Sequence, residues 1–166
     1  MPAPAWRDET MEARILQTVR MIASRSPARY AGISRYTGGA NMIERLMVPG
    51  QMPPVSHYCH VVRAGNQIWV SGAVGVKADG SIPAGTVEQF DLALAAVDAC
   101  LRHAGAGAQH VVKVNIYMTD IGERAAINPR RVEYFGEHRP ASTLVGVSAL
   151  VDPRMKVEIE AVAVVV

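Results

Sequence analysis

Residues 86–118, TVEQFDLALAAVDACLRHAGAGAQHVVKVNIYM, decide the fold class, because they join a strong helix pattern to a strong strand pattern. Thr86 opens the predicted helix, and Gln89 stands at the capping-box spacing from it. The glycine-rich stretch at 105–107 ends the helix. Four apolar side chains at helical spacing form its core-facing stripe: Phe90, Leu94, Val97 and Leu101.

The strand pattern covers residues 111–118. Its side chains alternate, so that Lys113 and Asn115 face one way and an apolar set faces the other. That apolar set consists of Val112, Val114, Ile116 and Met118.

Outward from this unit, the flanking segments complete a small α+β domain. Upstream, the β-rich runs 60–63 and 67–71 predict a hairpin across Ala64-Gly65-Asn66. Downstream, Asn128 followed by Pro129 predicts the cap and first turn of a second helix, which continues to Glu137 and is closed by Pro140. Strands at 143–150 and 155–166 follow, around the turn at Asp152-Pro153. The predicted order is β-β-α-β-α-β-β, a mixed sheet with both helices on one face. The other face is left uncovered, which favours an oligomer.

The domain is predicted to span residues 46–166, after an N-terminal extension at 1–45. In the extension, residues 8–24 have the spacing of an amphipathic helix, and residues 24–40 have the composition of a loop or disordered segment. Two alternatives stay open: a translated extension, or a start placed too early, with Met42 or Met47 beginning the domain. Glu9 and Glu12 argue against a transit peptide.

Charge and cysteine usage exclude several function classes. The formal charge is +2; seven arginines against four acids give residues 1–45 +3, so the predicted domain carries −1. This balance argues against a nucleic-acid partner, and no apolar run is long enough for a membrane partner. Cys59 and Cys100 have no motif spacing, which favours a reducing, cytoplasmic setting. His57 and His60, three residues apart near a strand, are unsuited to a shared metal ion.

Two carboxylates stand out in the last strand. Glu158 and Glu160 alternate with apolar residues, so both project from one face. Two interpretations remain open: a charged, solvated face or edge, and a pair in which one acid performs general acid–base chemistry in a cleft.

The segment that contains these acids resembles a known family signature. Residues 139–164, RPASTLVGVSALVDPRMKVEIEAVAV, are similar to the C-terminal signature of the RidA/YjgF family. Tyr58, the stretch 68–72 (IWVSG), the stretch 114–120, and Asn128 with Tyr134-Phe135 resemble the family's other segments in the same order. The resemblance covers about residues 50–166.

The resemblance implies a chorismate-mutase-like fold, assembled as a homotrimer with clefts between subunits. Deaminating members hydrolyse reactive enamines and imines to a carbonyl compound and ammonia, without a metal or an organic cofactor. By position, Tyr58 would line the cleft, Ser71 and Gly72 would contact the substrate, and Asn128 would border it. Glu158 would orient water or protonate the enamine carbon.

One departure from the family pattern concerns the substrate. The family's deaminases read Pro-Ala-Arg-Ser where this chain reads Pro140-Ala141-Ser142-Thr143. The missing arginine implies a cleft less suited to a small 2-iminoacid, with Ser142 lining a roomier pocket. Arg131 and Arg139 are alternative guanidinium donors, although a surface position is the simpler expectation for both. Two functions therefore stay open: an enamine or imine deaminase with another substrate, and a non-catalytic module that binds small molecules or protects proteins.

Overall fold

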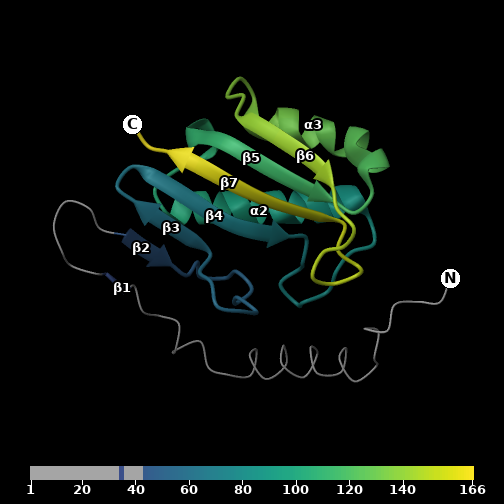
Figure 1. Ribbon diagram of the computed structural model, residues 1–166, viewed down its shortest axis with the longest axis horizontal. Helices are drawn as coiled ribbons and strands as arrows, with labels where there is room; N and C mark the ends of the chain where they lie inside the picture. Colours follow the sequence, from purple (N-terminus) through teal and green to yellow (C-terminus); the bar gives the residue numbers. More distant parts are fainter. Residues whose placement is uncertain (1–33, 36–42) are drawn as a thin grey trace.

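The computed structural model describes residues 34–35 and 43–166, which form one mixed sheet with helices packed against it (Figure 1). The sheet order is β1-β2-β3-β4-β7-β5-β6. Neighbouring strands are antiparallel except β5 and β6, which are parallel. The strands are β1 (Ser34–Arg35), β2 (Ile43–Leu46), β3 (Val61–Ala64), β4 (Gln67–Val74), β5 (Val111–Met118), β6 (Ala141–Gly146) and β7 (Val157–Val164). The predicted α+β class and the β-β-α-β-α-β-β order from β3 onward are confirmed.

The N-terminal strands β1 and β2 were not predicted. Strand β2 pairs with β3 from Ile43 onward, so the sheet begins ahead of residue 46. The predicted helix at 8–24 lies outside the described residues, as does most of the predicted loop at 24–40.

Both long helices lie on one face of the sheet, as predicted (Figure 1). The buried core residues fill the space between the helices and the sheet. Helix α2 (Thr86–His103) packs against β4 and β7, whereas α3 (Arg124–Phe135) packs beside α2. The predicted α2 stripe is buried, with Phe90 and Leu101 fully inaccessible to solvent. Cys100 is buried in the same core, which raises the pKa of its thiol to about 11.

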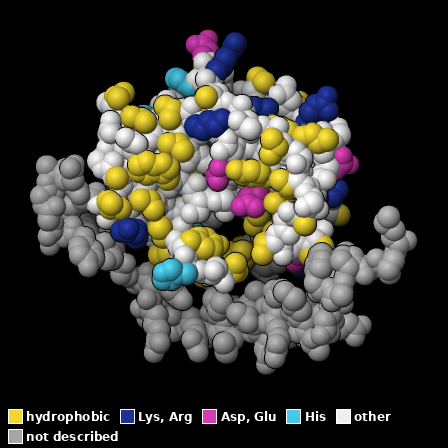
Figure 2. Space-filling model, in the orientation of Figure 1, with side chains coloured by type: hydrophobic (Ala, Val, Ile, Leu, Met, Phe, Trp, Pro, Cys, Tyr) yellow, Lys and Arg dark blue, Asp and Glu magenta, His cyan; other side chains and the backbone are white. Residues whose placement is uncertain are grey.

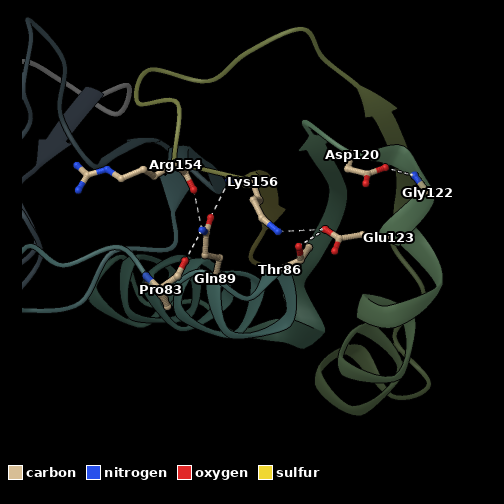
Figure 3. Close-up of polar contacts among 8 residues, drawn as sticks. All are labelled: Pro83, Thr86, Gln89, Asp120, Gly122, Glu123, Arg154 and Lys156. Atoms are coloured by element: carbon tan, nitrogen blue, oxygen red, sulfur yellow. Dashed lines mark hydrogen bonds and ion pairs between the residues drawn. The ribbon is translucent and has the colours of Figure 1, made fainter. Parts of the chain in front are cut away.

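The role predicted for Gln89 was wrong. Gly85, and not Thr86, occupies the N-cap position of α2, and the Gln89 side chain turns inward (Figure 3). Its Nε2 donates to the carbonyl oxygens of Pro83 (2.6 Å) and Arg154 (2.9 Å), while its Oε1 accepts from the Lys156 amide (2.7 Å). An amide that satisfies three backbone groups in the core connects α2 to the segment that enters β7.

The predicted start of the second helix was also wrong. Helix α3 begins at Arg124, directly after the 3-10 turn η3 (Ile121–Glu123), in which Asp120 accepts from the Gly122 amide (2.8 Å). Asn128 is therefore not a cap, and Pro129 lies inside the helix on its exposed side. The helix starts early because the Asp120 turn precedes it and because Ile127, which is fully buried, anchors the first turns.

The third correction concerns the start of β5. Val112 was predicted to face the core, but it is 47% exposed, and Val111 is buried instead. The pairing of β5 with β7 shifts between Val111 and Lys113, so the alternation holds only from Val114 onward. The last two strands are also shorter than predicted: β6 ends at Gly146, and β7 begins at Val157.

Two structural features are absent from residues 34–35 and 43–166. No helix in this part of the chain is long and apolar enough to cross a membrane. No group of three or more His, Cys, Asp or Glu residues there is placed to hold a metal ion.

Candidate active site

Glu158 and Glu160 project from the sheet face that the helices leave open. They alternate in β7 with Val157 and Ile159, both fully buried on the helix side, which confirms that the two acids share a face. Figure 2 shows this face, with acidic side chains near its centre, apolar side chains around them, and a hollow beside them. A shallow hollow of about 200 Å³ lies there, lined in part by Trp69, Ser71 and Glu160.

Glu160 is held by two polar side chains of β5. Asn115 Nδ2 donates to Glu160 Oε1 over 2.6 Å, and the Tyr117 hydroxyl donates to the same oxygen over 2.9 Å. The register explains both contacts, because β5 and β7 pair Asn115 with Glu160 and Tyr117 with Glu158. Glu160 therefore acts as a fixed hydrogen-bond acceptor.

Glu158 has a different environment. Among the described residues, none donates a hydrogen bond to its carboxylate, although the side chain is partly buried. Burial raises the pKa of Glu158 above its usual value, and the nearby charge of Glu160 raises it further. A carboxyl group in this state holds its proton closer to neutral pH, which suits a general acid.

Gly72 makes room for the Glu158 carboxyl group. A Cβ atom at position 72 would lie 2.8 Å from Glu158 Cδ, and closer still to Oε1. The β4–β7 pairing shifts here: Val70 pairs with Ala161 and Ala73 with Ile159, so Ser71 and Gly72 together stand opposite Glu160. This bulge places Gly72, which has no side chain, against the Glu158 carboxyl group.

Ser71 links the bulge to the loop that precedes β3. Its hydroxyl donates to the Cys59 carbonyl oxygen over 2.7 Å, and its amide donates to the His60 carbonyl oxygen over 3.0 Å. Tyr58 is adjacent in this loop and is 46% exposed. The His60 ring is engaged locally, because Nδ1 accepts from the Val48 amide over 2.9 Å. Gly72 thus lies against Glu158, and Tyr58 belongs to the loop that Ser71 holds.

Ser142 lies on the other face of the sheet. It pairs in register with Val114, which is 1% exposed and faces the helices. Its hydroxyl accepts a hydrogen bond from Arg131 Nη2 of α3 over 2.7 Å. Asn128 is exposed on the same helix, one turn before Arg131, and Arg139 is exposed in the connection to β6. Ser142 and Arg131 therefore form a second polar group, beside the edge strand β6.

Within one chain, Glu158 and the Ser142–Arg131 pair do not come together. Along β5, Glu158 is in register with Tyr117 and Ser142 with Val114, an offset of roughly 10 Å along the strand. The two side chains are also two strands apart and point to opposite faces. A site that used both would need a second copy of the chain.

Three polar residues on the open face were not predicted to belong to the site. Lys113, Asn115 and Tyr117 lie on β5 at a spacing of two, and Lys113 Nζ also donates to Thr143 Oγ1 over 2.6 Å. The alternation of polar and apolar residues in 111–118 was the available signal. It was interpreted as strand packing and not as part of a site.

The comparisons with known proteins agree with one another. A family model described as Endoribonuclease L-PSP matches residues 48–165. A RutC family protein of Pyrococcus abyssi is 36% identical over 113 residues, which are 66% of this chain and 87% of that protein. An Escherichia coli protein named "Putative reactive intermediate deaminase TdcF" is 34% identical over 128 residues, which are 74% of this chain and 95% of that protein.

Solved structures extend the likeness to the fold. The YjgF gene product of Escherichia coli superposes with a TM-score of 0.62 at 32% identity, covering 70% of this chain and 92% of that chain. RidA of a Psychrobacter species gives a TM-score of 0.64 at 29% identity, covering 68% and 91%. The chain therefore belongs to the YjgF/RidA family, whose family model is described as Endoribonuclease L-PSP.

Proposed function

We propose that this protein hydrolyses a reactive enamine or imine to a carbonyl compound and ammonia. The observation that carries the proposal is the environment of Glu158: a partly buried carboxyl group with a raised pKa, unengaged by the described residues and fitted against Gly72. The relationship to a protein named as a reactive intermediate deaminase supports the same chemistry.

The proposed reaction assigns Glu158 two successive tasks. Its protonated carboxyl group gives a proton to the enamine carbon, which leaves an iminium ion. The resulting carboxylate then draws a proton from a water molecule as the oxygen of that water attacks the iminium carbon. Proton transfer to nitrogen and collapse of the carbinolamine release ammonia and leave the carbonyl group. The net reaction consumes one water molecule, and no cofactor takes part in any step.

The proposed site lies between copies of the chain. The open sheet face supplies Glu158, Gly72, Ser71 and Tyr58 from one copy. The free edge at β6, with Ser142 and Asn128, comes from the next copy. A closed ring of three copies with three equivalent clefts satisfies this arrangement, because every copy then contributes both surfaces.

The test is ammonia release from freshly generated 2-iminopropionate and from a panel of larger enamines and imines. The Glu158→Gln variant should lose turnover, because an amide cannot supply the proton. The matched control is Glu88→Gln, which changes an exposed glutamate of α2 that pairs with Lys77 in the preceding loop. Release that persists at the original rate in Glu158→Gln would contradict the assigned role. No release from any compound by the folded wild-type oligomer would contradict the proposed reaction and favour a binding module.

A further inference from the structure

Gln89 is the most deeply buried polar side chain among the described residues. Its exposed fraction is 0%, whereas Thr86, the other buried polar residue of this part of the chain, keeps 5%. A buried carboxamide needs hydrogen-bond partners, and here Nε2 donates twice and Oε1 accepts once (Figure 3). All three partners are backbone groups of the two loops that lead into α2 and into β7.

The contact with the second of these loops lies two residues before Glu158. Gln89 Oε1 accepts from the Lys156 amide over 2.7 Å, and the Lys156 carbonyl oxygen accepts from the Thr119 amide over 3.0 Å. The backbone of Lys156 is therefore fixed on both sides, by α2 and by the residue that follows β5. Only Val157, which is fully buried, separates this fixed point from Glu158.

The backbone of Gln89 contacts the other strand of the site. Gly75 follows β4 directly, and a Cβ atom at this glycine would lie 2.4 Å from Gln89 Cα. Strand β4 also carries Gly72, against which the Glu158 carboxyl group fits, and its last residue, Val74, pairs with Glu158. One residue of α2 thus contacts both chain segments that adjoin the pair of Val74 and Glu158.

We propose that Gln89 is a positioning residue, which fixes the start of β7 against the end of β4 and thereby holds the Glu158 carboxyl group against Gly72. The fit is close, because a Cβ atom at position 72 would lie only 2.8 Å from Glu158 Cδ. Gln89 acts through the Lys156 peptide group and does not touch the substrate. The inference rests on the proposed function, because it takes Glu158 as the acid whose placement sets the rate.

The first measurement is the titration of Glu158 in the full chain in its native state, followed by carbon-13 NMR of labelled glutamate side chains and assigned with Glu158→Gln. Gln89→Met keeps the length of the side chain and its neutrality, and removes all three hydrogen bonds. The ionisable neighbours of Glu158, which are Glu160 and Tyr117, lie on the open face and are unchanged. The pKa of Glu158 should fall from its raised value toward that of an exposed glutamate, because a displaced carboxyl group is better hydrated.

Leu101→Ala is the matched control for a general loss of stability. Leu101 is fully buried in the same helix, roughly 18 Å further along the helix axis than Gln89. Its truncation leaves a cavity far from the start of β7, so the urea midpoint should fall as it does in Gln89→Met. The pKa of Glu158 should stay at its wild-type value.

Gln89→Glu is the conservative variant and the milder test of the fold. Burial favours the neutral form of the new side chain, which still offers an oxygen to the Lys156 amide but has one donor instead of two. The fold should lose stability, whereas the pKa of Glu158 should remain close to that of wild type. Stability and the placement of Glu158 are thereby separated.

Steady-state ammonia release is the second measurement, with 2-iminopropionate or with the member of the panel that the wild type hydrolyses fastest. In Gln89→Met, kcat should fall by about ten- to a hundredfold at an unchanged KM, because the acid is misplaced while the binding surfaces remain. Leu101→Ala and Gln89→Glu should keep most of the wild-type kcat.

The titration is independent of turnover, so the two proposals can fail separately. An unmoved Glu158 titration in folded Gln89→Met would overturn the inference, as would an equal shift in Leu101→Ala. If Gln89→Met does not fold, a Glu158 pKa lowered to the ordinary value in Gln89→Glu would overturn it. A shifted titration without ammonia release from any substrate would keep the positioning role and refute the deaminase. Ammonia release with both kcat and the titration unchanged in Gln89→Met would keep the deaminase and refute the positioning role.

Discussion

Replacement of Gly72 by alanine tests the fit between the β4 bulge and Glu158. The new Cβ would stand 2.8 Å from Glu158 Cδ. Carbon atoms in favourable contact are roughly 3.5 Å apart or more, so the carboxyl carbon must retreat by about 0.7 Å and its nearer oxygen by more. Misplacement of a reacting group by about 1 Å can cost on the order of a hundredfold in rate. We therefore expect kcat/KM to fall by about two orders of magnitude.

The same substitution should barely change stability, which makes the prediction specific. Gly72 has no positive φ, so an alanine there is not strained, and the flexible end of Glu158 can swing away. The free energy of unfolding should stay within about 1 kcal/mol of wild type. Steady-state ammonia release and urea denaturation measure the two quantities. The control is Gly85→Ala, whose Cβ would meet nothing closer than 3.9 Å. A Gly72→Ala protein as active as wild type would refute the assignment of Glu158.

Four other outcomes follow from the structure. Glu160→Gln should move the alkaline limb of the kcat/KM–pH profile to lower pH, because the charge of Glu160 raises the pKa of Glu158; an unchanged limb would contradict this. Glu158→Gln should stabilise the fold above the raised pKa of Glu158, where the wild type carries a desolvated carboxylate, and should not do so below about pH 4; urea melts at both pH values measure it. Gln89→Leu should cost about 2–5 kcal/mol, because three backbone groups lose their partner; a loss below 1 kcal/mol in the same melts would argue against this role. Cys100 should resist iodoacetamide until the chain unfolds, since burial raises the pKa of its thiol to about 11; mass spectrometry of the native protein reads this out, and rapid native labelling would contradict it.

The elements that were predicted well are those in which one periodic pattern dominates. The stripe from Phe90 to Leu101 is buried as expected, and the strand pattern at 111–118 gives β5. The errors arose where a local signal competed with tertiary contacts. Asn128-Pro129 has the sequence of a helix start, yet the Asp120 turn and the burial of Ile127 begin α3 earlier.

The site could be predicted only in part, because the hydrogen-bond partners of its two carboxylates depend on strand register. The sequence places Glu158 and Glu160 on one face, but it does not say which acid receives hydrogen bonds. That difference comes from Asn115 and Tyr117, which meet β7 only after β5 pairs with it. The late helix start in the prediction also left out Ile127, which is buried on α3 together with Phe135.

The position of Glu158 and Ser142 on opposite faces of one sheet makes the proposed cleft divisible between chains. In a ring of three, a Glu158→Gln chain would still offer its Ser142 half, and a Ser142→Trp chain, whose own half is blocked by the bulky side chain, would still offer its Glu158 carboxyl group. Random co-assembly of the two inactive proteins in equal amounts would restore about a quarter of the clefts. Each restored cleft would combine the unaltered residue of one variant with the unaltered residue of the other. Mixing after dissociation would thus produce an active enzyme from two inactive ones, and a mixture that stayed inactive would place the two residues in separate sites.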